Sequence, residues 1–407
     1  MHKTLALMWG MALWAGCGAA TATRTSAARV RPGIDVLVSD SIGLVRGRRI
    51  GLVTNQSGIG ASGAGDVELM RGAGLNLVAL FSPEHGFRGA ADPGAAVATA
   101  IDSATGLPIY SLYGRTSAPT DSMLRGIEIM VVDLQDAGAR YYTYISTTVE
   151  VMKAAARHGI PVIVLDRPDP IGGTVLGNVL NPAFTSFVGR LEVPMRYGMT
   201  LGELARLADA DFAIHSRLTI VPAAGWRRDM ALDDAGLAFV PPSPNLHTLE
   251  SLFHYPGTCL FEGTNLSVGR GSDAPFEQVG APWLDTTAVL ARIRAERLPG
   301  VAFSSTTFTP HRPGDGKYAD TLLAGVRLRV TDRGRYDPTV TAVHLMAAIR
   351  ATHPGRMRWS AAQFDRLAGG STLRTALESG KPAGEIVAPW AEALRQFEAR
   401  RRPFLIY

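Results

Sequence analysis

Polar clusters follow four apolar, strand-like runs of this sequence, and three of the clusters contain carboxylates. In chain order the clusters are Thr54-Asn55-Gln56, Ser82-Pro83-Glu84-His85, Asp133-Leu134-Gln135-Asp136 and Asp166-Arg167-Pro168. Two carboxyl groups held near one another can act as a general acid and a general base. Carboxylate chemistry is therefore one reaction type that these residues could support.

Glu84 lies in a segment that its neighbours should make rigid. Pro83 precedes it, and Gly86 and Phe87 follow shortly after. A carboxyl group in such a partly apolar pocket has a raised pKa and can donate a proton near neutral pH. The alternative is that Glu84 pairs with Arg88 at the surface, and the sequence leaves both open.

Aromatic and cationic side chains follow the second of the carboxylate clusters. Arg140 is followed by Tyr141, Tyr142 and Tyr144. Sugar rings stack on aromatic faces, and their hydroxyls bind carboxylate, amide and guanidinium groups, so this stretch would suit a sugar site. The structural alternative is that Asp133 caps the next turn and Arg140 neutralises it.

A glycine-rich segment, residues 261–271, provides a further set of candidates. It contains Glu262, Asn265 and Arg270 among three glycines. Such a density of glycine suits a loop whose backbone approaches a ligand. A tight connector between domains would have the same composition, so that interpretation also stays open.

Other chemistries have weaker support. Gly58-Ile59-Gly60-Ala61-Ser62-Gly63 has the spacing of a dinucleotide-binding loop, but Asn55-Gln56-Ser57 separate it from the preceding strand, which favours a flexible polar loop. The nine histidines are scattered, and no pair has HExxH spacing. GxSxG and GxxxxGK[ST] motifs do not occur. We therefore expect no cofactor and no metal.

The elements that must position these residues alternate between strand and helix patterns, which predicts a parallel sheet with crossover helices. The predicted strands are 50–53, 77–81, 129–132, 162–165 and 218–221, and the predicted helices are 144–158 and 201–210, the second opened by a capping box at Thr200-Leu201-Gly202-Glu203. Ligands bind at the carboxyl ends of such strands, so the four clusters should converge on one crevice. Asp166-Arg167 could also be an ion pair at a strand end.

Pro241-Pro242-Ser243-Pro244 interrupts this pattern, and residues 255–283 show little regular periodicity. We place a domain boundary near residue 253, between an α/β domain of residues 30–253 and a smaller α+β domain of residues 254–407. A long functional loop is the alternative. The second domain is predicted to contain helices near 286–296, 339–352 and 388–400 and strands near 302–308 and 322–330.

The first residues are typical of an export signal. Met1-His2-Lys3 precede an apolar stretch from 4 to 18, and small residues continue to 23. The stretch is too short to span a bilayer comfortably, which predicts a cleaved signal peptide over residues 1–23 and a periplasmic or envelope location. Trp14-Ala15-Gly16-Cys17 is also similar to a lipoprotein processing box, so attachment to a membrane is expected only if Cys17 is lipidated.

Composition narrows the class of partner. Hydrophobic residues make up 46% and charged residues 19% of the 407, as in ordinary globular proteins. The formal net charge is +5, but the cations are spread along the chain and cluster only at Arg400-Arg401-Arg402. No basic run is interleaved with aromatics, so we expect no nucleic-acid partner. If Cys17 is removed only Cys259 remains, which excludes an internal disulfide.

The same motifs resemble the NamZ-type exo-β-N-acetylmuramidase family. The shared stretches are Gly51-Leu52-Val53-Thr54-Asn55-Gln56, Ser82-Pro83-Glu84-His85-Gly86, Tyr110-Ser111-Leu112-Tyr113-Gly114, Asp133-Leu134-Gln135-Asp136, Asp166-Arg167-Pro168, 241–245 and 255–270. They occur in the family's order over nearly all of the chain after the signal. The resemblance implies a Rossmann-like domain without a nucleotide, a smaller auxiliary domain and a site in a cleft.

The resemblance also implies an activity, the release of N-acetylmuramic acid from the non-reducing end of peptidoglycan fragments. Glu84 would be one catalytic carboxylate, and Glu262, Asp133 or Asp166 would be the second. The expected substrate-binding residues are Asn55, Gln56, His85, Gln135, Asp136, Arg140, Tyr142, Arg167, Asn265 and Arg270.

Muramic acid carries a lactyl carboxylate, which Arg140, Arg167 or Arg270 could hold through a two-pronged contact. An exo-acting enzyme needs a pocket closed at one end, and residues 255–283 are the expected wall. One departure from the family is Lys153, where relatives often have a glutamate, with Glu150 one turn earlier. It leaves a non-catalytic protein that binds wall fragments as the alternative.

Overall fold

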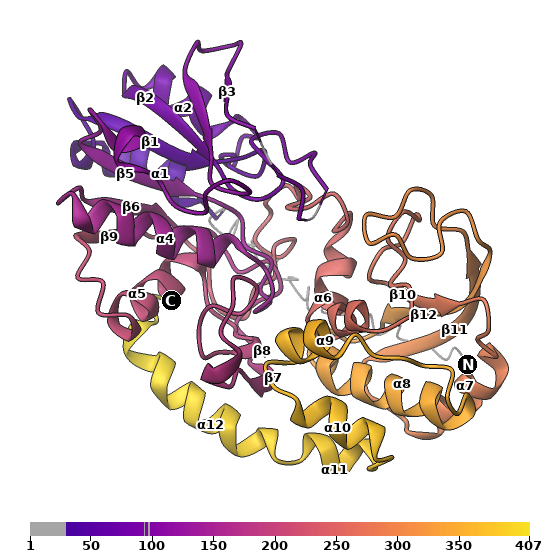
Figure 1. Ribbon diagram of the computed structural model, residues 1–407. Helices are drawn as coiled ribbons and strands as arrows, with labels where there is room; N and C mark the ends of the chain where they lie inside the picture. The colour runs from indigo at the N-terminus through magenta and orange to yellow at the C-terminus, as the bar shows by residue number, and fades with distance from the viewer. Residues whose placement is uncertain (1–29, 93, 97) are drawn as a thin grey trace, which may run out of the picture.

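The computed structural model describes residues 30–92, 94–96 and 98–407, which form two lobes (Figure 1). The predicted signal peptide and Cys17 lie outside the described residues. The first lobe contains a large, mainly parallel sheet, and the second contains a small antiparallel sheet. The predicted fold class, a parallel α/β domain with a smaller C-terminal domain, is confirmed.

A seven-stranded sheet is the centre of the first lobe, with the order β3-β4-β2-β1-β5-β6-β9. Its strands are β1 (Arg49–Thr54), β2 (Asn76–Ser82), β3 (Ala100–Ile101), β4 (Pro108–Ser111), β5 (Ile129–Asp133), β6 (Val162–Leu165) and β9 (Leu218–Val221). Each neighbouring pair is parallel except β3 and β4. The central strands are apolar between their ends, as expected where helices cover both faces of a parallel sheet.

Two hydrophobic cores lie on opposite faces of this sheet. The helices of the lobe are α1 (Gly33–Asp40), α2 (Asp66–Gly72), α3 (Asp121–Leu124), α4 (Tyr144–Arg157) and α5 (Leu201–Asp211). Leu52 of β1 packs with α1 and α2, whereas its neighbour Val53 packs with α4 and α5. Consecutive strand residues point to opposite faces, so each strand contributes to both cores.

The second lobe is an antiparallel sheet with the order β10-β12-β11, packed against helices. Its elements are α6 (Leu249–Thr258), η3 (Cys259–Gly263), β10 (Gln278–Ala281), α7 (Thr286–Ala295), β11 (Val301–Phe308), β12 (Leu323–Val330), α8 (Pro338–Thr352), α9 (Ala361–Ala368), α10 (Thr372–Glu378) and α11 (Ala383–Val387). The predicted division at residue 253 falls within α6.

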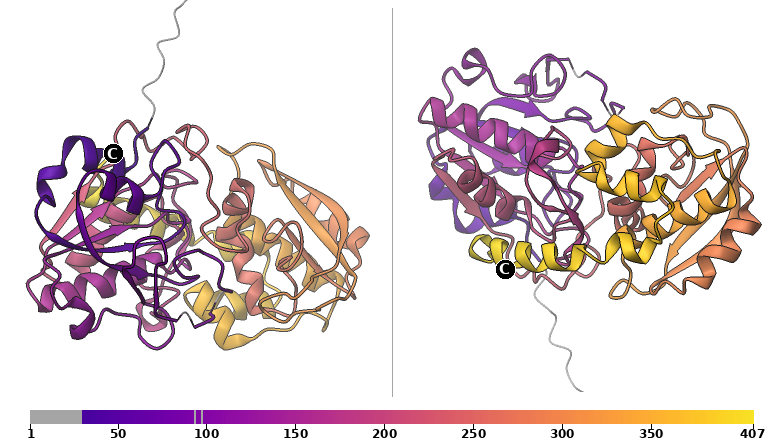
Figure 2. Two further views of the ribbon diagram at one scale, coloured as in Figure 1. Left: turned by 90° about the horizontal axis from the view of Figure 1, so that it is seen from above. Right: turned by 60° about the horizontal axis from the view of Figure 1, so that its bottom comes forward.

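The chain ends on the first lobe rather than the second. Helix α12 (Trp390–Arg401) runs from the second lobe back along the first, as Figure 1 and the right-hand view of Figure 2 show. Arg400 pairs with Asp211 of α5 at 2.6 Å. The hydroxyl of Tyr407 donates to Asp166 at 2.9 Å. This return connects the lobes a second time.

The remaining short elements belong mainly to the first lobe. They are η1 (Ile42–Leu44), the hairpin of β7 (Leu176–Val179) and β8 (Pro194–Arg196), η2 (Pro182–Phe184) and η4 (Arg402–Phe404). The capping box predicted at Thr200 is present, with both reciprocal hydrogen bonds to Glu203. Helix α6 was not predicted, because Pro256 and Gly257 in its last turn are residues that usually interrupt a helix. The structure shows that a capping box at Thr248 begins this helix.

Candidate active site

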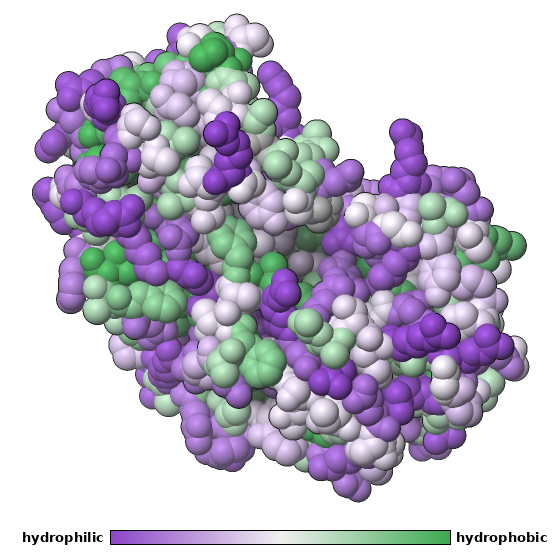
Figure 3. All heavy atoms as spheres, viewed as in Figure 1, coloured by the Kyte–Doolittle hydropathy of each residue, from purple (hydrophilic) through white to green (hydrophobic). Residues whose placement is uncertain are grey.

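A pocket of about 100 Å³ lies where the two lobes meet. The first lobe contributes side chains that include Glu84, His85 and Tyr142, and the second contributes Glu262 and Arg270. Figure 3 shows the surface hollowed between the lobes. Five of the side chains predicted from the sequence are therefore brought together here, from positions up to 186 residues apart, the separation between Glu84 and Arg270.

The turn after β2 positions Glu84. His85 and Gly86 have φ angles of 70° and 77°, so two consecutive residues adopt the left-handed conformation and the chain turns sharply away from the sheet. The left-handed conformation costs a non-glycine residue on the order of 1–2 kcal/mol. A hydrogen bond from the backbone N–H of Gly86 to the carbonyl of Pro83, at 3.1 Å, helps to hold the turn.

Each carboxylate oxygen of Glu84 accepts one hydrogen bond. Oε1 accepts from the backbone N–H of Gly94, and Oε2 accepts from the hydroxyl of Thr143, both at 2.8 Å. Thr143 immediately precedes α4, so the helix start and the turn hold the carboxyl group from two sides. Glu84 is buried, and its carboxyl group has lone pairs left for a ligand in the pocket.

His85 is held as a neutral imidazole with a defined tautomer. Its Nδ1 lies 2.9 Å from the carbonyl oxygen of Ala91, and because a carbonyl can only accept, Nδ1 carries the proton. Burial lowers the pKa of His85, although the Ala91 carbonyl and the charge of Glu84 oppose that effect. Nε2 is therefore left as a hydrogen-bond acceptor.

An ion pair from the second lobe forms the opposite side of the pocket. The Nη2 and Nε atoms of Arg270 lie 2.5 and 2.6 Å from Oε1 of Glu262. Burial acts to lower the pKa of Arg270, but the adjacent Glu262 carboxylate raises it more. The Arg270 guanidinium also lies 5.0 Å from the ring centre of Phe276. The guanidinium thereby holds the Glu262 carboxyl group beside the pocket.

One nitrogen of Arg270 is left for a ligand. Nη1 is buried and has no hydrogen-bond partner among the described residues. Leaving such a donor unpaired is costly, so a ligand anion that reached it would gain a charge-assisted hydrogen bond. Glycine is required beside it: Gly271 has a φ of 75°, and an added Cβ would lie 2.5 Å from the carbonyl oxygen of His311.

Lys317 holds the backbone that carries the ion pair. Its Nζ donates to the carbonyl oxygens of Glu262, at 2.9 Å, and Leu266, at 3.1 Å. Burial lowers the pKa of Lys317, although the neighbouring carboxylates oppose it. Nothing in the sequence pattern indicated this lysine, because its partners are backbone atoms about fifty residues away.

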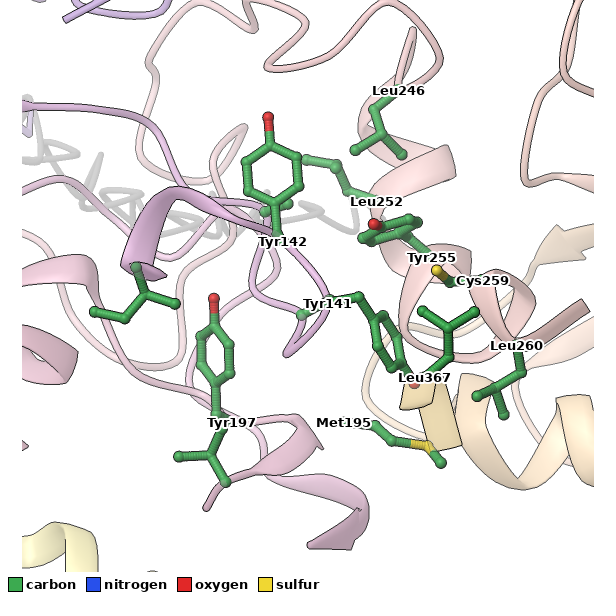
Figure 4. Packing of buried hydrophobic residues seen from close by; sticks show 14 of the residues in the cluster. Tyr141, Tyr142, Met195, Tyr197, Leu246, Leu252, Tyr255, Cys259, Leu260 and Leu367 are labelled. Atoms are coloured by element: carbon green, nitrogen blue, oxygen red, sulfur yellow. The ribbon is translucent and has the colours of Figure 1, made fainter. Parts of the chain in front are cut away.

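Aromatic rings from both lobes form a wall of the pocket (Figure 4). Tyr255 meets Tyr141 edge to face at 6.0 Å and Phe276 at 4.9 Å between ring centres. The hydroxyl of Tyr141 donates to Pro256 at 2.9 Å, and that of Tyr142 donates to Pro242 at 2.7 Å. The tyrosines therefore stay fixed by their polar ends while their faces remain apolar.

Two of the predicted carboxylates are engaged inside the first lobe. Asp133 forms a two-pronged ion pair with Arg167, at 2.5 and 2.8 Å, and is fully buried. Asp166 accepts from the hydroxyl of Thr200 at 2.6 Å and the backbone N–H of Gly202 at 2.8 Å, as well as from the C-terminal tyrosine. Neither aspartate lines the pocket.

Arg140 and Asp136 likewise form hydrogen bonds within the fold and do not line the pocket. The guanidinium of Arg140 donates to the carbonyls of Asn178, Val193 and Leu367 at 2.8 to 3.0 Å. Asp136 accepts from the hydroxyl of Tyr197, and burial raises the pKa of this aspartate well above its ordinary value. The two terminal nitrogens of this arginine are therefore bound to backbone carbonyls, and its buried Nε has no partner among the described residues.

None of the four predicted amide side chains lines the pocket, and each forms hydrogen bonds elsewhere in the fold. Asn55 donates to the hydroxyl of Tyr144 at 2.5 Å, and Gln56 donates to Pro241 at 3.0 Å. Gln135 donates to Pro168 at 3.1 Å. Asn265 ties the glycine-rich segment to residues 356–358 through both ends of its amide.

The four strand-end clusters therefore do not all converge on the pocket, contrary to expectation. Gln135 and Arg167, from the clusters that follow β5 and β6, instead meet the loop after β1 at a separate crevice of about 20 Å³, which Leu232 and Leu237 also line. This crevice lies where the strand order reverses, the usual place for a nucleotide, but it has no room for one. Lys153 and Glu150 lie away from the pocket, where Glu150 pairs with Arg190.

Several pocket residues were not among the predicted site residues. They are Tyr141, Thr143, Val188, Ser243, Leu246, Tyr255, Cys259, Phe276 and Leu367. Tyr255, Cys259 and Phe276 belong to the segment expected to form a wall, which was the available signal for them. The arrangement of two carboxylates, one arginine and an aromatic wall can bind a sugar and cleave a glycosidic bond by acid–base chemistry.

Comparison with known proteins agrees with this chemistry. Family models described as the N-terminal and C-terminal parts of the exo-beta-N-acetylmuramidase NamZ match residues 50–250 and 253–407. A peptidoglycan beta-N-acetylmuramidase from Bacillus subtilis strain 168 is 42% identical over 417 residues, covering 100% of both chains. Two crystal structures of DUF1343 family proteins from Bacteroides fragilis have TM-scores of 0.85 and 0.76, with 32% and 30% identity, covering 93% of this chain and 99% of each of theirs.

Proposed function

Since the chain belongs to the NamZ family of exo-β-N-acetylmuramidases, we propose that the pocket between the lobes is its active site and that Glu84 and Glu262 are the catalytic carboxylates. The chain is a glycoside hydrolase that releases terminal N-acetylmuramic acid from peptidoglycan-derived saccharides. One observation supports the site above all: of the four carboxylates that the sequence offered, these two line one pocket and come from different lobes.

Glu84 is assigned the proton transfer to the leaving sugar. Cleavage breaks the bond between the anomeric carbon and the glycosidic oxygen, and the oxygen must gain a proton as it departs. Gly94 and Thr143 hold the carboxyl group at the pocket, so its orientation does not have to be acquired during the reaction. A positioned acid of this kind contributes about 10²–10⁴-fold to the rate.

Glu262 is assigned the role of the charged partner. Positive charge develops at the anomeric carbon in the transition state, and a carboxylate nearby stabilises it and then acts as nucleophile or base. The ion pair with Arg270 holds the Glu262 carboxyl group at the pocket, where this role requires it. The two carboxylates thus have different surroundings, as expected for an acid and its partner.

Arg270 is assigned the recognition of the muramyl group. N-acetylmuramic acid differs from N-acetylglucosamine by a lactyl ether that carries a carboxylate. The unpaired Nη1 of Arg270 suits that carboxylate, and Arg270 lines the pocket. Arg140 and Arg167 do not line it, and they donate to backbone carbonyls and to Asp133 instead. The aromatic wall supplies apolar faces for the sugar ring.

The test is a pair of disaccharides with the two sugars in opposite order. We expect free N-acetylmuramic acid from N-acetylmuramyl-β-1,4-N-acetylglucosamine, and no product from the disaccharide in which glucosamine is the non-reducing sugar. The products are measured by liquid chromatography and mass spectrometry. No release from several saccharides that end in muramic acid would contradict the function, and equal cleavage of both disaccharides would contradict the recognition by Arg270.

We also propose that the protein is exported to the periplasm or envelope, on the strength of the pattern over residues 1–23. Within the part of the chain that the structure describes, no helix is both long enough and apolar enough to cross a membrane. Fractionation of cells that express the full chain tests the location, and Cys17→Ala tests lipidation by labelled fatty acid. A protein recovered from the cytoplasm with its first residues intact would contradict export.

A further inference from the structure

A second hollow opens on the first lobe, with a volume of about 600 Å³. It is lined by the hydroxyl side chains of Ser111, Thr116, Thr120 and Ser122 and by the guanidinium of Arg115. Its volume lies within the range of about 300–1,000 Å³ that is usual for small-molecule sites. The first of these residues is in a stretch that the family shares, but the reaction assigned above does not use any of them.

The hollow lies at the same edge of the sheet as Glu84. Strands β2 and β4 are parallel neighbours, and Ser111 at the end of β4 is in register with Ser82 at the end of β2. The backbone N–H of Leu112 donates to the carbonyl of Ser82 at 2.9 Å, so the two chains leave the sheet side by side. Glu84 comes two residues after one strand, and the hollow begins at the end of the other.

Tyr113 connects the hollow with the active site. It lies in the chain between Ser111 and Arg115, both of which line the hollow. Burial and then the negative charge of Glu84 raise the pKa of Tyr113 to about 12. Its ring centre is 5.9 Å from that of Phe187, the neighbour of a residue that lines the pocket.

The polar groups of the hollow are suited to sugar hydroxyl, acetamido and carboxylate groups. The hydroxyl of Thr116 donates to the carbonyl of Ala118 at 2.7 Å, and that of Ser111 donates to the carbonyl of Tyr113 at 2.9 Å, so both keep a free lone pair. Arg115 is exposed and forms no ion pair or hydrogen bond through its side chain with any other described residue. It is free to bind an anionic group.

We propose that this hollow binds the leaving side of the saccharide, which is the aminosugar that carries the glycosidic oxygen and the sugars beyond it. The inference rests on the proposed function. An exo-acting pocket holds the terminal sugar, and Glu84 must touch the oxygen that the terminal sugar shares with the next. The rest of the chain therefore leaves the pocket past Glu84, where the hollow lies. Arg115 would pair with the lactyl carboxylate of the next muramic acid along.

The experiment compares three substrates that share the terminal N-acetylmuramic acid. A 4-nitrophenyl muramoside has no sugar on the leaving side, the disaccharide has one and the tetrasaccharide has three. For the wild type we expect kcat/KM to be at least about tenfold higher for the tetrasaccharide than for the disaccharide. A factor of ten is what one additional favourable contact with the substrate would give. In the double variant Arg115→Ala, Thr116→Val this advantage is lost, while the nitrophenyl muramoside is affected far less.

Arg125→Ala is the matched control, since Arg125 is an exposed arginine of the same segment that does not line the hollow. It should keep the wild-type preference for long substrates, and melting temperatures should agree among all three proteins. Equal kcat/KM for the two saccharides in the wild type, or equal loss on all three substrates in the double variant, would overturn the leaving-side site alone. No hydrolysis of any substrate by the wild type would overturn the proposed function and this site with it.

Discussion

The carboxylates at the ends of β5 and β6 have different surroundings from the one after β2, although all three lie at the carboxyl edge of one parallel sheet. Asp133 and Asp166 are fully buried, and their hydrogen-bond partners come from within the first lobe and the C-terminal residue. Glu84 is also held by two donors, but it lines a pocket that the second lobe completes. The position of a carboxylate in the sheet therefore does not decide its role.

The two aspartates differ from Glu84 in what surrounds the carboxyl group beyond its hydrogen-bond donors. A buried charge must be paired, and Arg167 meets that need for Asp133 completely. Glu84 faces Arg270 and Glu262 across a pocket that belongs to both lobes. We interpret the pair of Asp133 and Arg167 as part of the scaffold and Glu84 as part of the catalytic site. The following predictions test that division.

The largest effect on stability is expected at Asp133. Asp133→Ala leaves Arg167 charged and unpaired in the interior, which should cost about 3–5 kcal/mol of the free energy of unfolding. Urea unfolding measures this. The control Asp229→Ala removes an exposed pair with Arg227 and should cost less than about 1 kcal/mol. An Asp133→Ala protein that was as stable as the wild type but inactive would contradict the structural role of Asp133 and would indicate a catalytic one.

A smaller effect is expected at Arg270, on activity rather than stability. Arg270→Lys keeps the charge beside Glu262 but loses the fixed fork of donors, so kcat/KM on the muramyl disaccharide should fall about 10–100-fold, mainly through KM. Arg374→Lys is the control, because Arg374 forms a similar two-pronged pair with Asp365 away from the pocket. Equal kinetics for the two variants would contradict the role of Arg270.

The smallest effect is a pH dependence of stability from the scaffold. Burial raises the pKa of Asp166 from 3.8 to about 6. Between these values the unfolded chain loses its proton first, so the free energy of unfolding falls as pH rises, by at most about 1.4 kcal/mol per pH unit for one proton. Asp166→Asn should flatten that slope in urea unfolding between pH 4 and 6. An unchanged slope would show that Asp166 is not the group that titrates.

Much of the first lobe could be predicted because its signals are local. The apolar runs 50–53, 129–132 and 162–165 are strands, and the capping box at Thr200 starts α5 as expected. Helix α6 was missed because proline and glycine in its last turn outweighed its cap in the pattern. The return of α12 to the first lobe depends on contacts such as Arg400 with Asp211, which no local pattern contains.

The candidate site could be predicted only in part, for a related reason. Residue types indicated Glu84, Glu262 and Arg270, and the structure brings these together. Residue types could not show that the terminal nitrogens of Arg140 donate to backbone carbonyls, because those carbonyls lie far away in the sequence. Whether a polar side chain is satisfied inside the fold depends on tertiary contacts, and this decides which candidates remain free to bind a substrate.

The most direct test of the central assignment is the turnover number of Glu84→Gln on the muramyl disaccharide, measured beside its melting temperature. Glutamine keeps the shape of the side chain but cannot supply a proton, so kcat should fall by about 10²–10⁴-fold while the melting temperature stays close to that of the wild type. A folded variant with an unimpaired kcat would contradict the assignment of Glu84 as the catalytic acid.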